Sequence, residues 1–317
     1  VKSLVKNSRF MNRKLLLLFG LVLSLSIFTY LVYQKLSWEP LPPFRLEKRT
    51  TGVGDTAWAG PIAEASARLT EAANALQVPS LSVAVGVDGE LVWCEALGYA
   101  DLDQEIAATP TTAYRIGSTS KAITSVAAML LVQEGRWDLD RPVAEYLPAF
   151  PPKRWDFSTR QLLSHTAGIV DYEDLNVPGL FYTLFNFKHF ESVEEGLGVF
   201  QDLPLLYEPG TSFKYNSFDI VLASRVLEEV SGRPYLDYLL DALFQPLGMT
   251  NSYGDHGPYG GGQEAVFYQL DGKGRFRAWH TFGFPRNEVN LSYKWAGGGL
   301  LSTPADLVRM GNALLRD

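Results

Sequence analysis

The sequence predicts an α+β fold in which an antiparallel sheet is flanked by helices and joined to a helical lobe, preceded by a transmembrane helix. Three observations lead to this prediction. An uncharged apolar run extends from Leu15 to Tyr33, two β-rich segments are joined by Asp88-Gly89, and several later segments repeat apolar residues at helical spacing.

The apolar run from Leu15 to Tyr33 is long enough to cross a bilayer as a helix. The residues before it are basic and never acidic: Lys2, Lys6, Arg9, Arg13 and Lys14. By the positive-inside rule, we expect the N-terminus in the cytoplasm and the rest of the chain on the periplasmic or extracellular side. The alternative is a signal peptide cleaved near Ser24-Leu25-Ser26, which would give a secreted protein.

We expect residues 1–36 to form the tail and anchor, 37–57 a proline-containing linker, and 58–317 the folded domain. The domain begins with a helix from Pro61 to Gln77, where apolar residues recur at helical spacing. A hairpin follows, because the β-rich segments 81–87 and 91–93 flank Asp88-Gly89, a strong turn signal.

The rest of the chain reads as helices, one further hairpin and turns. We expect helices after Lys121, within 137–152, and over 159–168 with a cap at Ser158 or Thr159. Two further helices are expected over 217–230, before Gly232, and over 234–247. A hairpin over 266–279 follows, and then a last helix near Pro304, capped by Ser302 or Thr303.

Composition excludes several functions. The 317-residue chain is 46% hydrophobic and 20% charged, as is usual for a folded protein. Its net charge is -7 and no basic run follows the N-terminal segment, so nucleic acid is not an expected partner. One cysteine, Cys94, excludes an internal disulfide, and the four scattered histidines form no metal-binding pair, so no metal site is expected.

Ser118 and Lys121 form a Ser-x-x-Lys motif at the start of an apolar helical run. Residues three apart share one face of a helix, so the hydroxyl and the amine should lie side by side. The unpaired N–H groups and the positive dipole end at the helix N-terminus favour developing negative charge. This pattern is typical of an acyl-transfer nucleophile beside its base, and the alternative interpretation is a serine that only caps the helix.

Two other polar groups have simpler interpretations. Asp171, Glu173 and Asp174 could be the paired carboxylates of a glycosidase, but their loop position favours a solvated charge cluster. His165 is expected to be a structural residue at the end of its helix.

Four motifs occur in order along the chain: 114–121 with Ser-x-x-Lys, 162–168 (LLSHTAG), 213–217 (FKYNS) and 296–307 (AGGGLLSTPADL). Together they resemble the beta-lactamase-related serine hydrolases, which include class C beta-lactamases, D-Ala-D-Ala carboxypeptidases and esterases. The resemblance is strongest to the subgroup of mitochondrial serine beta-lactamase-like proteins and their bacterial relatives. It covers roughly Leu76 to the C-terminus and implies a beta-lactamase/transpeptidase-like fold.

The resemblance implies a role for each matched residue. Ser118 would be the acyl-forming nucleophile, Lys121 the base or proton relay, and Tyr215 a base or acid beside the serine. Ser217 stands where the family's Tyr-x-Asn motif has asparagine, so we expect it to contact substrate with a shorter reach. The family's third motif, Lys-Thr-Gly or His-x-Gly, is not in the chain, and we therefore expect a C-terminally truncated piece of a longer protein. The resemblance implies no cofactor.

We therefore predict a membrane-anchored serine hydrolase, of peptidase or esterase type, that acts through an acyl-enzyme on a peptide, ester or amide carbonyl. A penicillin-binding or D-Ala-D-Ala carboxypeptidase-like protein is one alternative, and a catalytically impaired membrane scaffold with the same fold is another. The expected partners are a small-molecule or peptide substrate and the membrane, and the resemblance is compatible with a homo-oligomer.

Overall fold

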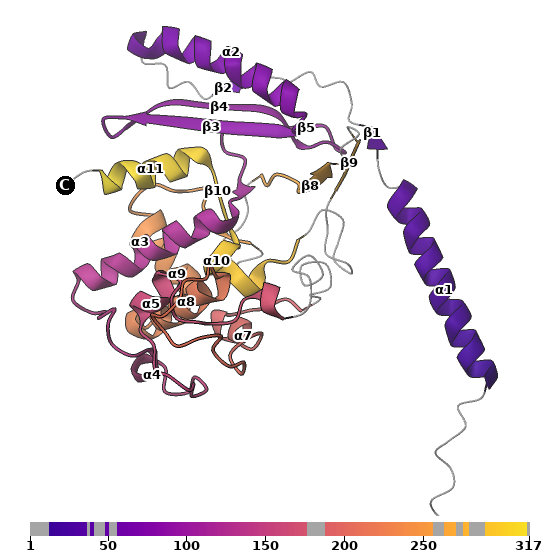
Figure 1. Ribbon diagram of the computed structural model, residues 1–317. Helices are drawn as coiled ribbons and strands as arrows, with labels where there is room; N and C mark the ends of the chain where they lie inside the picture. The colour runs from indigo at the N-terminus through magenta and orange to yellow at the C-terminus, as the bar shows by residue number, and fades with distance from the viewer. Residues whose placement is uncertain are drawn as a thin grey trace, which may run out of the picture. The chain divides into compact units, whose positions relative to one another are not determined.

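The computed structural model describes residues 13–36, 39–40, 48–50, 56–175, 188–255, 263–270, 275–278 and 289–315 (Figure 1). The chain divides into two compact units: Val1–Pro43 with Tyr268–Arg277, and Phe44–Phe267 with Ala278–Asp317. The smaller unit contains helix α1 (Arg13–Leu36) and a sheet in the order β1 (Glu39–Pro40), β9 (Arg275–Ala278), β8 (Tyr268–Leu270). The second predicted hairpin is therefore present as β8 and β9, and its turn, 271–274, lies outside the described residues.

Helix α1 confirms that the apolar N-terminal run is helical. Within the described ranges, however, no helix is both long and apolar enough to cross a membrane. The transmembrane helix predicted from Leu15 to Tyr33 is therefore not found in the structure.

The first hairpin of the larger unit is as predicted. Strand β3 (Ser80–Val87) pairs antiparallel with β4 (Glu90–Asp101). Asp88 and Gly89, at the turn, have φ values of 51° and 84°. A two-residue turn with both residues in the left-handed region matches the twist of the strands, which explains the Asp-Gly signal. Strands β2 (Lys48–Thr50) and β5 (Ile106–Ala107) also pair with β4.

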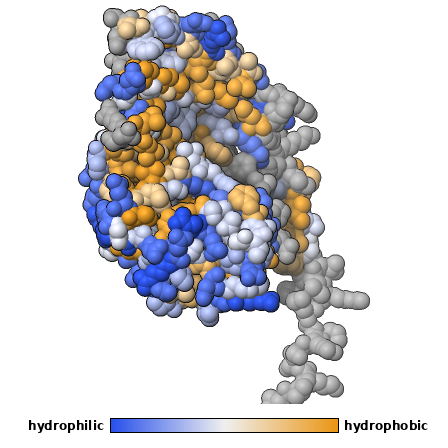
Figure 2. Space-filling view, turned by 60° about the vertical axis from the view of Figure 1, so that its left-hand side comes forward, coloured by the Kyte–Doolittle hydropathy of each residue, from blue (hydrophilic) through white to orange (hydrophobic). Residues whose placement is uncertain are grey.

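Two helices flank this sheet, α2 (Ala59–Leu76) on one side and α11 (Pro304–Leu314) on the other (Figure 1). The start of α11 confirms the predicted cap, because the Thr303 hydroxyl accepts a hydrogen bond from the Asp306 N–H at 3.2 Å. Residues of β3 and α11 line an apolar groove on the surface. Figure 2 shows a broad apolar area between a hydrophilic top and a largely hydrophilic lower part of this face.

The helical lobe is built around α3 (Ser120–Gln133) and α8 (Ser217–Ser231), with α10 (Trp295–Gly298) packed on both. Its core side chains are fully buried and belong to one apolar cluster, which includes Ile123, Leu131, Phe218, Leu222, Leu227, Leu239 and Leu300. The lobe also contains α4 (Val143–Tyr146), α5 (Thr159–Leu163), α7 (Val193–Leu197) and α9 (Tyr235–Leu239).

Two predicted helices differ from the structure. Helix α5 has the predicted Ser158 cap but ends at Leu163 rather than 168, because His165 has a left-handed φ of 58° that a right-handed helix cannot contain. The helix predicted over 234–247 is α9 continued by one π-helical turn, Leu240–Phe244. Helix α8 ends as predicted, with Gly232 in the left-handed conformation at φ 71°.

A second small sheet connects the sheet region to the helical lobe. Strand β10 (Leu300–Ser302) lies between β6 (Tyr114–Arg115) and β7 (Tyr253–Gly254), with Leu301 paired to Arg115. The buried Arg115 guanidinium forms a two-point contact with the Asp255 carboxylate, at 2.9 and 3.1 Å. This sheet holds β6, which leads to Ser118, beside β10, which directly follows α10.

Candidate active site

Ser118 lies in a tight turn between a strand and a helix. The 3-10 turn η2 (Gly117–Thr119) follows β6 and leads directly into α3. Gly117 opens the turn with φ +52°, a conformation that a side chain would strain. Ser118 is exposed. The predicted position at a helix N-terminus is confirmed, so backbone N–H groups at the start of α3 are close to the hydroxyl.

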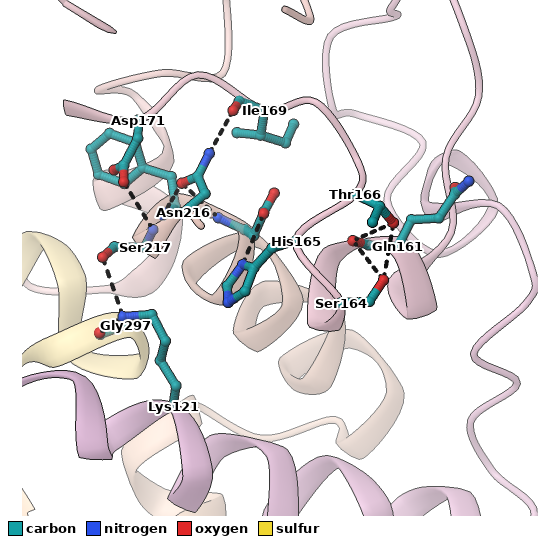
Figure 3. Close-up of polar contacts among 12 residues, drawn as sticks. Lys121, Gln161, Ser164, His165, Thr166, Ile169, Asp171, Asn216, Ser217 and Gly297 are labelled. Carbon is teal, nitrogen blue, oxygen red and sulfur yellow. Dashed lines mark hydrogen bonds and ion pairs between the residues drawn. The ribbon is translucent and has the colours of Figure 1, made fainter. Parts of the chain in front are cut away.

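Lys121 lies one turn into α3 and its side chain is buried, with 9% of its surface exposed. The amine donates hydrogen bonds to the Ser118 hydroxyl at 3.1 Å, the Ser217 hydroxyl at 3.3 Å and the Gly297 carbonyl at 2.5 Å. Figure 3 shows the last two contacts, which come from α8 and α10. Three oxygens therefore surround the amine.

Tyr215 lies beside both residues. Its ring centroid is 4.7 Å from the Lys121 amine, and 49% of the residue is exposed. Burial raises the pKa of the Tyr215 phenol, but hydrogen bonds with Lys121 and Ser118 and the positive charge of Lys121 outweigh it, so the pKa is lowered overall. The structure therefore brings Ser118, Lys121 and Tyr215 together, as the sequence predicted.

Ser217 has a different environment from the one expected. It is buried, its hydroxyl accepts the Lys121 hydrogen bond, and its N–H donates to Asp171 at 3.2 Å (Figure 3). The neighbouring Asn216 caps α8 by accepting from the Phe218 and Asp219 N–H groups. Ser217 thus supports Lys121, and its contact with substrate stays a prediction.

Asp171 is a site residue that sequence reasoning misinterpreted. The expectation of a solvated cluster is wrong for this residue, which is 5% exposed, whereas Glu173 is exposed and Asp174 pairs with Lys214. Asp171 begins the 3-10 turn η3 (Tyr172–Asp174) and faces the site. Burial raises the pKa of its carboxyl, partly offset by N–H donors from Tyr172 and Ser217.

His165 and Asp219 form a second pair that supports Tyr215. His165 follows the end of α5 by two residues, close to the expected position, and its ring lies 4.9 Å from the Tyr215 ring. Its Nδ1 lies 3.2 Å from Asp219 Oδ2, and Asp219 Oδ1 is buried with no partner among the described residues. Burial raises the pKa of Asp219 to about 7, opposed by its contact with His165. Nothing in the sequence marked Asp219 as a site residue apart from its place in a predicted helix.

Position 297 requires a glycine, because α10 approaches the start of α8 very closely there. A Cβ at this position would lie 2.7 Å from the Ser217 carbonyl oxygen, which is too close for any real contact. This close approach lets the carbonyl of Gly297 reach Lys121.

The fold and this cluster define the class of protein, one with a beta-lactamase/transpeptidase-like fold. The chain belongs to the Beta-lactamase family, whose pattern matches residues 66–317. The resemblance predicted from the four motifs is confirmed.

One curated relative and two solved structures illustrate what this chain is similar to. The chain is 32% identical to the mitochondrial serine beta-lactamase-like protein LACTB of Homo sapiens, over 75% of this chain and 53% of that protein, so it spans about half the length of that relative. Among solved structures, an octameric penicillin-binding protein homologue from Pyrococcus abyssi has a TM-score of 0.64 and 28% identity, over 79% of this chain and 55% of that one. A D-amino acid amidase from Ochrobactrum anthropi has a TM-score of 0.62 and 30% identity, over 76% and 65%.

The close approach at Gly297 generates a prediction. We expect Gly297→Ala to lower the free energy of unfolding by ~1–3 kcal/mol, because α10 must move away from α8, and to displace the carbonyl that holds Lys121. Chemical denaturation measures the loss. Gly311→Ala is the matched control, because a Cβ there meets nothing within 4 Å and alanine favours a helix. Equal stability of the two variants would contradict the prediction.

Asp219 generates a second prediction. A carboxyl whose pKa rises from 3.8 in the unfolded chain to about 7 in the folded one stabilises the fold at low pH. This stabilisation is lost as pH rises from about 4 to about 7, by at most ~4 kcal/mol. Asp219→Asn should remove that part of the pH dependence, so the variant gains stability relative to wild type over this interval. Urea unfolding at intervals of pH checks it, with the exposed Asp156→Asn as control. Parallel profiles for Asp219→Asn and wild type would overturn the assignment.

Proposed function

We propose that this protein is a serine acyl hydrolase in which Ser118 is the nucleophile. The observation that carries the proposal is the exposed Ser118 hydroxyl, 3.1 Å from a buried lysine amine that lies 4.7 Å from the ring centroid of Tyr215, a phenol of lowered pKa. A serine hydroxyl is a weak nucleophile until a neighbouring base takes its proton, and this arrangement supplies one.

The proposed mechanism divides the work between Lys121 and Tyr215. Lys121, as an ammonium, stabilises the ionised phenol, which accepts the Ser118 proton as Oγ attacks the substrate carbonyl carbon. The N–H groups at the start of α3 stabilise the oxyanion. Tyr215 then gives the proton to the leaving group as its bond to the carbonyl carbon breaks. Water then gives a proton to the same phenolate and attacks the resulting ester. As the bond to Ser118 Oγ breaks, Tyr215 returns that proton to Oγ and the acid is released.

The substrate is proposed only as a class. The Ochrobactrum anthropi relative is an amidase of D-amino acids, which supports testing amides alongside esters. The penicillin-binding relative supports the second candidate function, a stable acyl-enzyme that traps a penicillin. Membrane anchoring, location outside the cytoplasm and homo-oligomer formation stay predictions.

A labelling experiment tests the proposal. We expect a fluorophosphonate probe to label wild type and Thr119→Ala, which lacks the neighbouring exposed hydroxyl, but not Ser118→Ala. Tyr215→Phe should lower kcat/KM on an activated ester by ~10²–10⁴-fold, because the base is lost. Labelling that persists in Ser118→Ala would exclude Ser118 as the nucleophile.

A time course separates the alternatives. With a fluorescent penicillin, a bound label that decays within minutes supports turnover, and one that persists for hours supports the penicillin-binding function. No label from either probe on a folded protein would favour the scaffold.

A further inference from the structure

Lys294 is a second lysine near the turn that carries Ser118. It is the last residue of the 3-10 turn η5 (Ser292–Lys294) and directly precedes α10, which supplies the Gly297 carbonyl to Lys121. Its Cε lies 3.8 Å from the position that a Cβ would take on Gly298, and the Gly117 carbonyl carbon lies 3.7 Å from the same point. The aliphatic part of Lys294 therefore passes close to the turn that carries Ser118.

The amine of Lys294 lies among aromatic rings rather than carboxylates. Its Nζ is 5.2 Å from the centroid of the Tyr293 ring and 5.5 Å from that of Tyr172. In the part of the chain that the structure describes, this amine has no hydrogen bond and no ion pair. Burial lowers its pKa, opposed by electrostatic interactions with Tyr172, Asp171 and Tyr215.

The charged groups around Ser118 therefore differ in how many hydrogen-bonding partners each one has. The amine of Lys121 is surrounded by three oxygens. The carboxylate of Asp171 is engaged by two N–H groups, from Tyr172 and Ser217, and makes no ion pair with Lys294. A partly buried ammonium that makes no ion pair is unfavourable, and a ligand that brings a carboxylate removes this penalty.

We infer that Lys294 binds a carboxylate of the substrate while Ser118 attacks its carbonyl, which makes Lys294 a residue that determines specificity for anionic substrates. This inference rests on the proposed function of Ser118. A carboxylate fits better than a phosphate dianion, because phosphate sites combine several N–H donors or a guanidinium, whereas here a single amine lies beside two aromatic rings.

The carboxylate can belong to the acyl group or to the leaving group, and matched esters distinguish the two. 4-Nitrophenyl hydrogen glutarate carries it on the acyl side, with 4-nitrophenyl butyrate as the neutral counterpart. 3-Carboxyphenyl butyrate carries it on the leaving group, with phenyl butyrate as the neutral counterpart. Each pair is measured on wild type, Lys294→Met, Lys294→Arg and, as control, Lys188→Met, which removes an exposed lysine.

We expect Lys294→Met to lower kcat/KM for one of the carboxylate esters by ~10–100-fold, mainly through KM, because a charged hydrogen bond is lost. The neutral esters should change less than ~3-fold, which also reports that the variant is folded. Lys294→Arg should retain most of the discrimination. Equal losses on charged and neutral esters would overturn the inference, as would no loss on either carboxylate ester.

A binding measurement keeps this test separate from the proposed function. If wild type hydrolyses none of the esters, the proposed function fails, and N-acetylalanine and its amide are titrated by calorimetry into Ser118→Ala and Ser118→Ala/Lys294→Met. Binding of the acid to Ser118→Ala alone, without binding of the amide, supports the carboxylate site. Equal binding of acid and amide, or of acid to both variants, or no binding at all, overturns it.

Discussion

Three segments that are far apart in the sequence meet at the amine of Lys121: the turn before α3, the first residue of α8 and the backbone of α10. Each contributes one oxygen, and the contacts with Ser217 and Gly297 form only when α8 and α10 are in place. The buried amine is therefore both part of the site and a constraint on packing. Removing any of its acceptors would leave a charged group poorly solvated inside the protein.

The surrounding core reinforces the same meeting point. One helical turn after Lys121, the Thr124 hydroxyl contacts the Tyr235 hydroxyl at 2.7 Å and the Ala296 carbonyl at 3.0 Å. Thr124 thus binds α10 one residue before Gly297, so polar contacts from two successive turns of α3 hold α10. Gly297 also approaches Ser217 closely, so α10 packs directly against α8 as well as against α3. Stability of the helical lobe and geometry of the site depend on the same contacts.

Much of this arrangement could be predicted from local sequence. Hydrophobic spacing identified α2, α3 and α8, and Asp88-Gly89 identified the hairpin, because these signals act over a few residues. The resemblance identified Ser118, Lys121 and Tyr215. The end of α5 could not be predicted, since a left-handed histidine leaves no composition signal.

The partners of the site were harder to predict for a related reason. Asp171 stands in an acidic stretch that reads as solvated, and its burial depends on contacts with the start of α8. No sequence motif marked Asp219 or Lys294 as a residue of the site. Only the fold brings them to the interior, where burial, rather than residue type, determines their chemistry. Long-range proximity of this kind has no counterpart in sequence spacing.

The small sheet β6–β10–β7 has a consequence for how the site can fail. Ser118 follows β6 by three residues, and Gly297 precedes β10 by three. The pairing of Leu301 with Arg115 therefore sets the distance between the Ser118 hydroxyl and the backbone carbonyl of Gly297. A slip of one residue would shift one strand by ~3.3 Å along the other and reverse the faces of its side chains. Such a shift exceeds the tolerance of any hydrogen bond to Lys121, so misregistered molecules would be wholly inactive rather than slow. A preparation with partial activity would then be a mixture of two populations.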